Sequence, residues 1–170
     1  MRTIALSLLL AIGLLVPAAS AESAIPSRLD KAKAGEWVVM RDISVGGEEE
    51  IMRISVSAVR EGNPKVVVLK RERLAPDGSV EESKEMELDL DSYAERVRGL
   101  EDKAKQISRE RLTVKDKELT VYAVSWDDER DDVVREFKIW VSEDLPIGGI
   151  AKFWCSDPEM PSAEVVDYGF

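Results

Sequence analysis

Residues 51–90 read IMRISVSAVREGNPKVVVLKRERLAPDGSVEESKEMELDL, and this stretch decides the fold class. Its first ten residues alternate between apolar and polar side chains, which is the period of a strand with one buried face. Gly62-Asn63-Pro64 and Pro76-Asp77-Gly78 are turn sequences, and they separate two further strand-like runs, residues 65–74 and 80–90. Three strands joined by two short turns predict an antiparallel sheet.

The same strand pattern continues on both sides of this stretch. The further predicted strands are residues 37–40, 108–114, 119–126, 133–141, 150–155 and 163–168. Lys115-Asp116-Lys117 and the acidic segment 127–132 are expected to form hairpin turns between them. About nine short strands with mostly short connections predict a mainly β (α+β) fold, built as a curved antiparallel sheet or half-barrel.

Helical spacing interrupts the strands once. Four residues recur every three or four positions after residue 92, namely Tyr93, Val97, Leu100 and Ala104. Ser92 and Glu95 form a capping box before this stripe, which predicts a helix over residues 93–106. We expect its apolar face to plug the inner face of the sheet. A short N-terminal helix is expected over residues 28–34, with Ser27 as its cap.

The first 21 residues differ from the rest of the chain. Arg2 is their only charge, an apolar run follows over residues 4–16, and Ala19-Ser20-Ala21 ends the segment. This order is typical of a secretory signal peptide, and the run is shorter than the ~20 residues of a membrane helix. We therefore expect a single domain over residues 22–170, exported to the periplasm or beyond the cell, without a membrane span. With no cysteine near the cleavage site, a lipoprotein anchor is not expected.

The composition argues against several functions. A net charge of −10 disfavours nucleic acid and anionic membrane surfaces as partners. The chain has no histidine, so the commonest general base and metal ligand are missing, as is every Ser-His or Cys-His pair. The alternating carboxylates of residues 127–132 resemble a calcium loop, but Asp132 and Lys138 occupy the positions of its glycine and last glutamate. We expect no catalytic residue, no cofactor and no metal site.

Cys155 is the only cysteine, so an internal disulfide is not possible. Alternation places it on the same strand face as Ala151 and Phe153. The thiol is then buried and inert, as free cysteines commonly are, or it pairs between chains, or it is reactive.

Both ends of the domain resemble a group of uncharacterised secreted bacterial proteins. The matching segments are Gly35-Glu36-Trp37-Val38, KIWVS at 138–142, LPIGGIAK at 145–152 and VVDYG at 165–169. Proteins of the group begin with a G-x-W-V strand, carry W-x-S-x-x-V-P-x-G-G near the end, and close with Y-G. The resemblance implies no activity. In outline the architecture is similar to the lipoprotein-localisation-factor (LolA-like) fold, an incomplete antiparallel barrel with helices on its concave face.

Two functions are compatible with these features. The protein could be a carrier for an apolar ligand or a lipidated partner, with a cavity lined by Trp37, Met86, Leu88, Tyr93, Val97, Leu100, Trp126, Trp140 and Trp154. Alternatively these side chains are core anchors, and the protein is a structural or interaction domain of the cell envelope with no small-molecule site. An apolar cavity on the order of several hundred Å³ would distinguish the two.

Overall fold

The computed structural model describes residues 25, 29–43, 47–130 and 132–170. The expected signal peptide, its cleavage site and Ser27 lie outside the described residues. The elements are η1 (Leu29–Lys31), β1 (Trp37–Ile43), β2 (Glu49–Arg60), β3 (Val66–Leu74), β4 (Val80–Asp89), α1 (Leu90–Lys103), β5 (Gln106–Val114), β6 (Lys117–Arg130), β7 (Val133–Val141), η2 (Ile147–Gly149), β8 (Ile150–Cys155) and β9 (Ser162–Gly169).

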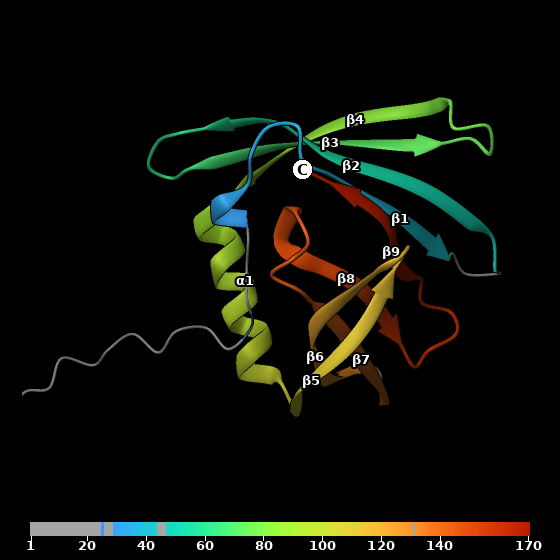
Figure 1. Cartoon of the computed structure of the whole chain (residues 1–170). Coiled ribbons are helices and arrows are strands. Elements are labelled where there is room, and N and C mark those ends of the chain that lie inside the picture. The colour runs from blue at the N-terminus through green and yellow to red at the C-terminus, as the bar shows by residue number, and fades with distance from the viewer. Residues whose placement is uncertain (1–24, 26–28, 44–46, 131) are drawn as a thin grey trace, which may run out of the picture.

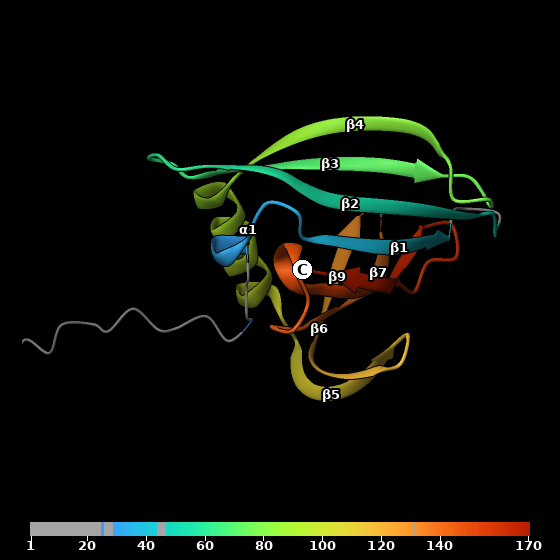
Figure 2. The same ribbon diagram turned by 45° about the horizontal axis from the view of Figure 1, so that its top comes forward.

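Within the described residues the nine strands form one antiparallel sheet in the order β4-β3-β2-β1-β9-β8-β7-β6-β5. The sheet curves but does not close, so β4 and β5 are its two edges. In Figure 1 it bends from β4 and β3 at the top to β5, β6 and β7 at the bottom, and Figure 2 shows β4 as the outer strand. The mainly β fold class and the curved sheet are as predicted.

Helix α1 connects the two edge strands and stands beside the open side of the curve (Figure 1). It begins at Leu90 rather than at the predicted residue 93, because Asp89 is the cap. It ends at Lys103 rather than at the predicted residue 106, which already belongs to β5. The Asp89 side chain accepts hydrogen bonds from the backbone N–H groups of Asp91 (2.8 Å) and Ser92 (3.3 Å). Among the described residues no helix has the length and apolarity needed to cross a membrane.

The predicted helix over residues 28–34 is wrong in extent. Only the single 3-10 turn η1 forms in its described part. The chain then joins the sheet early, since Gly35 N–H donates to the Val56 carbonyl (2.9 Å) and Val56 N–H to the Glu36 carbonyl (2.8 Å). These two bonds fix the backbone before a further helical turn can form.

The expected loop over residues 127–132 is also shorter than predicted. Strand β6 continues to Arg130, and Asp127 and Glu129 pair in register with Glu136 and Val134 of β7. Charged side chains suit a hairpin that extends past the core, because its end is solvated on both faces. Asp127 forms an ion pair with Lys105.

The buried side chains form three apolar clusters. Cluster one joins the end of the β5–β6 hairpin to β1, β9 and the β7–β8 loop, and its buried members are Val38, Val114, Leu119, Val121, Leu145, Ala151 and Val165. Cluster two consists of Leu29, Ala32, Val56, Val67 and Leu69. Cluster three consists of Ile25, Val124, Ile139 and Val141. Helix α1 packs against clusters two and three.

Candidate functional site

The candidate site is the apolar layer between α1 and the sheet, here called the α1 interface. Leu90 and Tyr93 at the start of the helix, with Leu88 of β4, pack against cluster two. Val97, Leu100 and Ala104, with Trp126 and Phe153, pack against cluster three. The interface therefore brings together five residues of the predicted cavity lining, Leu88, Tyr93, Val97, Leu100 and Trp126.

Helix α1 lies on this layer as a cover. None of its fourteen residues is fully buried, although its apolar stripe faces the sheet. The Tyr93 hydroxyl donates to the Gly148 carbonyl (3.3 Å), which ties the first turn of the helix to the β7–β8 loop. A helix without a buried residue contributes less to the core than the strands do, because burial of whole apolar side chains dominates stability.

Ile25, Leu29 and Ala32 fill the deepest part of the α1 interface. Ile25, Leu29 and Ala32 are 2%, 1% and 6% exposed, and they belong to clusters three, two and two respectively. The backbone N–H of Ile25 donates to Glu101 Oε1 of α1 (2.6 Å). The cavity lining predicted from the sequence contains none of these three residues. The apolar pair Ile25 and Leu29, four residues apart and just before the first strand, was the available indication.

The other predicted lining residues lie elsewhere. Trp140 lies on the opposite sheet face from Ile139, and its Nε1–H donates to Glu110 Oε2 (2.9 Å). Trp37 lies against Gly169, where a Cβ would come within 2.6 Å of its Nε1. Met86 is 49% exposed and Trp154 is 38% exposed.

Aromatic rings extend the α1 interface along the sheet. The rings of Trp126 and Phe137 are stacked with centroids 5.5 Å apart, and Phe153 lies 6.1 Å from Phe137. Stacked and tilted ring pairs of this kind add stabilisation beyond the area that they bury. The three partly buried rings form one end of the apolar layer.

A separate pocket of about 160 Å³ lies on β2, β3 and β4, lined by Glu50, Met52, Arg71, Arg73, Glu82 and Lys84. Every lining side chain except Met52 is charged, unlike the lining of the predicted apolar cavity. Asp42 lies near it, 3.8 Å from Arg71. Burial raises the pKa of Asp42, with Glu50 also raising it and Arg71 lowering it. Within the pocket Arg73 pairs with Glu50 (3.9 Å) and with Glu82 (3.6 Å).

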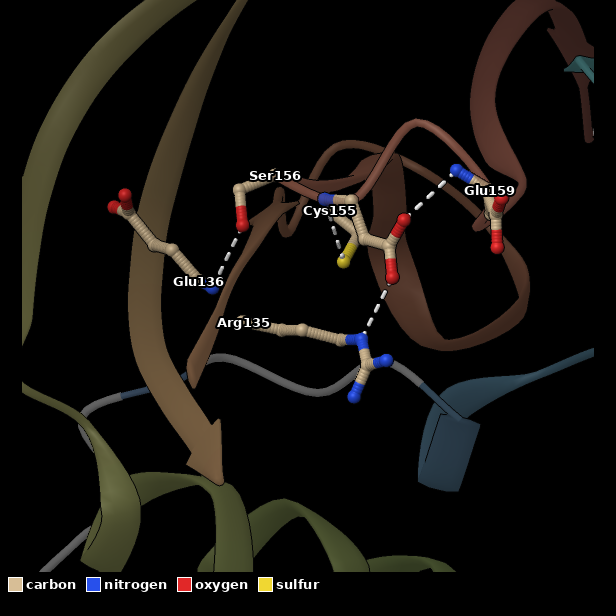
Figure 3. A network of polar contacts seen from close by, with 6 residues as sticks. Arg135, Glu136, Cys155, Ser156 and Glu159 are labelled. Carbon is tan, nitrogen blue, oxygen red and sulfur yellow. Dashed lines mark hydrogen bonds and ion pairs between the residues drawn. The ribbon is translucent and has the colours of Figure 1, made fainter. Parts of the chain in front are cut away.

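Cys155 is a buried free thiol on β8, as the alternation predicted. Figure 3 shows it within a set of loop contacts. Asp157 N–H donates to the Cys155 sulfur (3.5 Å), while the Asp157 carboxylate accepts from Arg135 Nε (2.7 Å) and from Glu159 N–H (2.9 Å). These contacts shape the β8–β9 loop. Whether the thiol is inert remains a prediction.

Across the outer face, polar side chains link five strands. Glu110 of β5 accepts from Trp140 and from Lys138 Nζ (3.1 Å), and the ammonium groups of Lys138 and Lys152 lie 4.6 and 5.6 Å from the Trp140 ring centroid. Lys152 then pairs with Glu164 (3.5 Å), which pairs with Arg41. The hydrogen bond from Trp140 lowers the pKa of Glu110, and the bond from Lys138 adds to this effect.

This lowered pKa predicts a pH dependence of stability. A carboxylate whose pKa falls on folding stabilises the fold above its ordinary value of 4.5, and this stabilisation is lost as the pH falls through the lower folded value. Glu110→Gln should therefore make the melting temperature fall less steeply between about pH 5 and 3. The control is Glu85→Gln on the exposed edge strand. If the melting temperatures of the wild type and of Glu110→Gln fall equally steeply with pH, the prediction that the Glu110 carboxylate stabilises the fold is wrong.

Comparisons with known proteins identify the fold. No family model matches the chain, and no curated protein matches it. Among solved structures the chain is similar to a presumed exported protein with a YmcC-like fold from Bacteroides fragilis, with a TM-score of 0.51. The sequences are 8% identical, and the match covers 82% of this chain and 97% of the other. At this identity the likeness shows a shared fold. In the described part of the chain no three His, Cys, Asp or Glu side chains are grouped to hold a metal ion.

Proposed function

We propose that the protein is an exported, non-catalytic binding protein that holds an apolar ligand or a lipidated partner at the α1 interface. The position and the incomplete burial of α1 support this proposal most directly. The helix spans the open side of the sheet and covers an apolar layer without burying any of its own residues fully. An element of this kind can move away from the sheet at a smaller cost than a core strand.

Export is supported by two observations. The first 21 residues have the order of a secretory signal peptide, and the similar solved structure is a presumed exported protein. The resemblance of both ends of the domain to uncharacterised secreted bacterial proteins, which is a prediction from the sequence, implies the same location. The ligand-contacting residues in this proposal are Leu88, Tyr93, Val97, Leu100 and Trp126.

A second candidate function is an interaction domain without a small-molecule site. It is favoured by Ile25 and Leu29, whose side chains fill the α1 interface almost without exposure. In this case the apolar layer is an ordinary core, and partners would bind the outer surface.

Nile red, a neutral apolar dye, distinguishes the two functions. A binding protein should bind the dye with a Kd in the micromolar range. This Kd corresponds to a binding free energy of about −8 kcal/mol. Leu100→Ala should change this affinity several-fold and also reduce stability, by roughly 2 kcal/mol for a half-buried leucine.

The matched control is Leu112→Ala, which truncates a half-buried leucine packed against cluster one. It should reduce stability and leave dye affinity unchanged. Absence of dye binding by the wild type, or equal affinities for Leu100→Ala and Leu112→Ala, would favour the interaction domain.

A further inference from the structure

We propose that the charged pocket on β2, β3 and β4 binds a small aromatic carboxylate, with the carboxylate held by Arg71 and Lys84 and the ring against Met52. This pocket, here called the β2–β4 pocket, is lined by Glu50, Met52, Arg71, Arg73, Glu82 and Lys84. It is separate from the α1 interface. The inference therefore goes beyond the proposed function, since a different part of the sheet binds a ligand of different chemistry.

The register of the sheet gathers the lining residues on one face. Arg71 of β3 lies opposite Lys84 of β4, and Arg73 of β3 lies between Met52 of β2 and Glu82 of β4. Residues directly opposite each other on neighbouring strands share a face of the sheet, where their side chains interact. The three strands run side by side in Figure 2, so the lining side chains form one continuous surface.

Arg71 and Lys84 are a pair of like charges. The other pairs of charged residues in the β3–β4 register combine opposite signs, as Lys70 and Glu85 do. Like charges directly opposite each other destabilise a sheet, so the pair Arg71–Lys84 is a cost to the fold. An anion bound between the two side chains would replace this repulsion with attraction to both.

These two cations have donors left for a ligand, whereas Arg73 does not. Carboxylates of three glutamates lie 3.1–3.9 Å from the guanidinium nitrogens of Arg73. In the described part of the chain the one carboxylate paired with Arg71 is that of Asp42, and its distance of 3.8 Å is too long for a hydrogen bond. Within the same residues Lys84 has no ion-pair partner. A planar guanidinium binds both oxygens of a carboxylate, and an ammonium beside it binds one.

The size of the pocket and its one apolar lining residue indicate the rest of the ligand. The pocket measures about 160 Å³. An engineered cavity of about 150 Å³ in another protein binds benzene, whereas a single water needs only about 10–15 Å³. Met52 is 6% exposed, and a thioether contacts the edge of an aromatic ring favourably. A ring the size of benzene with one carboxylate matches both the volume and the lining better than a small inorganic anion does.

The experiment is a titration of the protein with benzoate, followed by the NMR signal of the Met52 methyl group. A ring bound beside this methyl should shift its signal, which places the ligand in the β2–β4 pocket. We expect a Kd of about 1 mM or below, because the pocket is partly open to solvent. Benzamide, which has the ring without the charge, should bind at least about tenfold more weakly. Acetate and inorganic phosphate, which have the charge without the ring, should also bind more weakly, and cyclohexanecarboxylate should bind several-fold more weakly.

Lys84→Gln tests the like-charge pair through two readouts that move in opposite directions. It should weaken benzoate binding about tenfold, because a hydrogen bond between charged groups is lost. It should also raise the melting temperature of the ligand-free protein by about 1–2 °C, because the repulsion from Arg71 is removed. The matched control is Lys70→Gln, which makes the same charge change on the other face of β3, where Lys70 pairs with Glu72. It should leave the benzoate Kd unchanged and should not raise the melting temperature.

Asp42→Asn should change the affinity in the other direction. The Asp42 carboxylate is the existing partner of Arg71 and repels a second carboxylate beside it. Its removal should tighten benzoate binding several-fold.

Four results would overturn the inference, and each rejects a different part of it. No shift of the Met52 signal at about 10 mM benzoate means that the pocket binds no such ligand. Acetate or phosphate binding as tightly as benzoate means an adventitious ion only, and equal affinity for cyclohexanecarboxylate rejects the aromatic class. Equal effects of Lys84→Gln and Lys70→Gln mean that the net charge of the protein, not the pocket, attracts the anion. None of these results bears on the proposed function, which Nile red binding at the α1 interface tests separately.

Discussion

Gly149→Ala is expected to destabilise the protein by about 2–5 kcal/mol. Gly149 has a φ of 76°, and an L-residue in the left-handed region costs roughly 1–2 kcal/mol. A Cβ at this position would also overlap the Ser142 carbonyl oxygen and lie 3.3 Å from the Ser142 carbonyl carbon. These are backbone atoms, and Ser142 N–H is itself bonded to the Gly149 carbonyl (2.8 Å). The β7–β8 loop must therefore open to make room for the Cβ. Inserting an extra carbon into a packed region typically costs roughly 1–3 kcal/mol.

Gly78→Ala separates these two contributions. Gly78 has a similar φ of 83°, but a Cβ there meets no atom within 4 Å. Its loss of stability should be limited to the backbone cost of roughly 1–2 kcal/mol. The measurement is urea unfolding of both variants, compared at equal m-values. Equal losses for Gly149→Ala and Gly78→Ala would show that the close approach to Ser142 does not matter.

The strands could be predicted from the sequence because their information is local. Alternation and flanking turn residues gave the limits of β7 and β8 as the structure has them, Val133–Val141 and Ile150–Cys155. The start of α1 was less determined, since Asp89 and Ser92 are both good caps. Asp89 rather than Ser92 becomes the cap because of a contact between residues distant in sequence. This contact is the hydrogen bond from Leu90 N–H to the Lys65 carbonyl (3.1 Å).

The α1 interface could be predicted only in part. Tyr93, Val97 and Leu100 follow from helical spacing, but Trp140 has the same apolar character as Trp126 and faces the other way. Local composition does not distinguish a ring that donates a hydrogen bond to a carboxylate, such as Trp140, from a ring that packs in the α1 interface, such as Trp126. The contribution of Ile25 depends on Glu101, 76 residues away. Contacts at such separations depend on how the whole sheet curves, which no local pattern records.

Leu145→Ala is the second substitution expected to have a large effect. Leu145 is 0% exposed and belongs to cluster one, which joins the β7–β8 loop to the β5–β6 hairpin, β1 and β9. Truncation removes its transfer free energy and leaves a cavity, so the expected loss is about 2–5 kcal/mol. Val134→Ala is the surface control, since Val134 is 58% exposed on β7, and should stay within about 0.5 kcal/mol of the wild type.

The same variant separates the fold from the proposed site. Leu145 packs in cluster one, whereas the α1 interface consists of clusters two and three. Folded Leu145→Ala protein should therefore bind Nile red with wild-type affinity, although it unfolds at a lower urea concentration. A loss below about 1 kcal/mol would mean that the loop relaxes to fill the space and that cluster one tolerates a void. A change in dye affinity as large as that of Leu100→Ala would mean that cluster one and the α1 interface respond as a single unit.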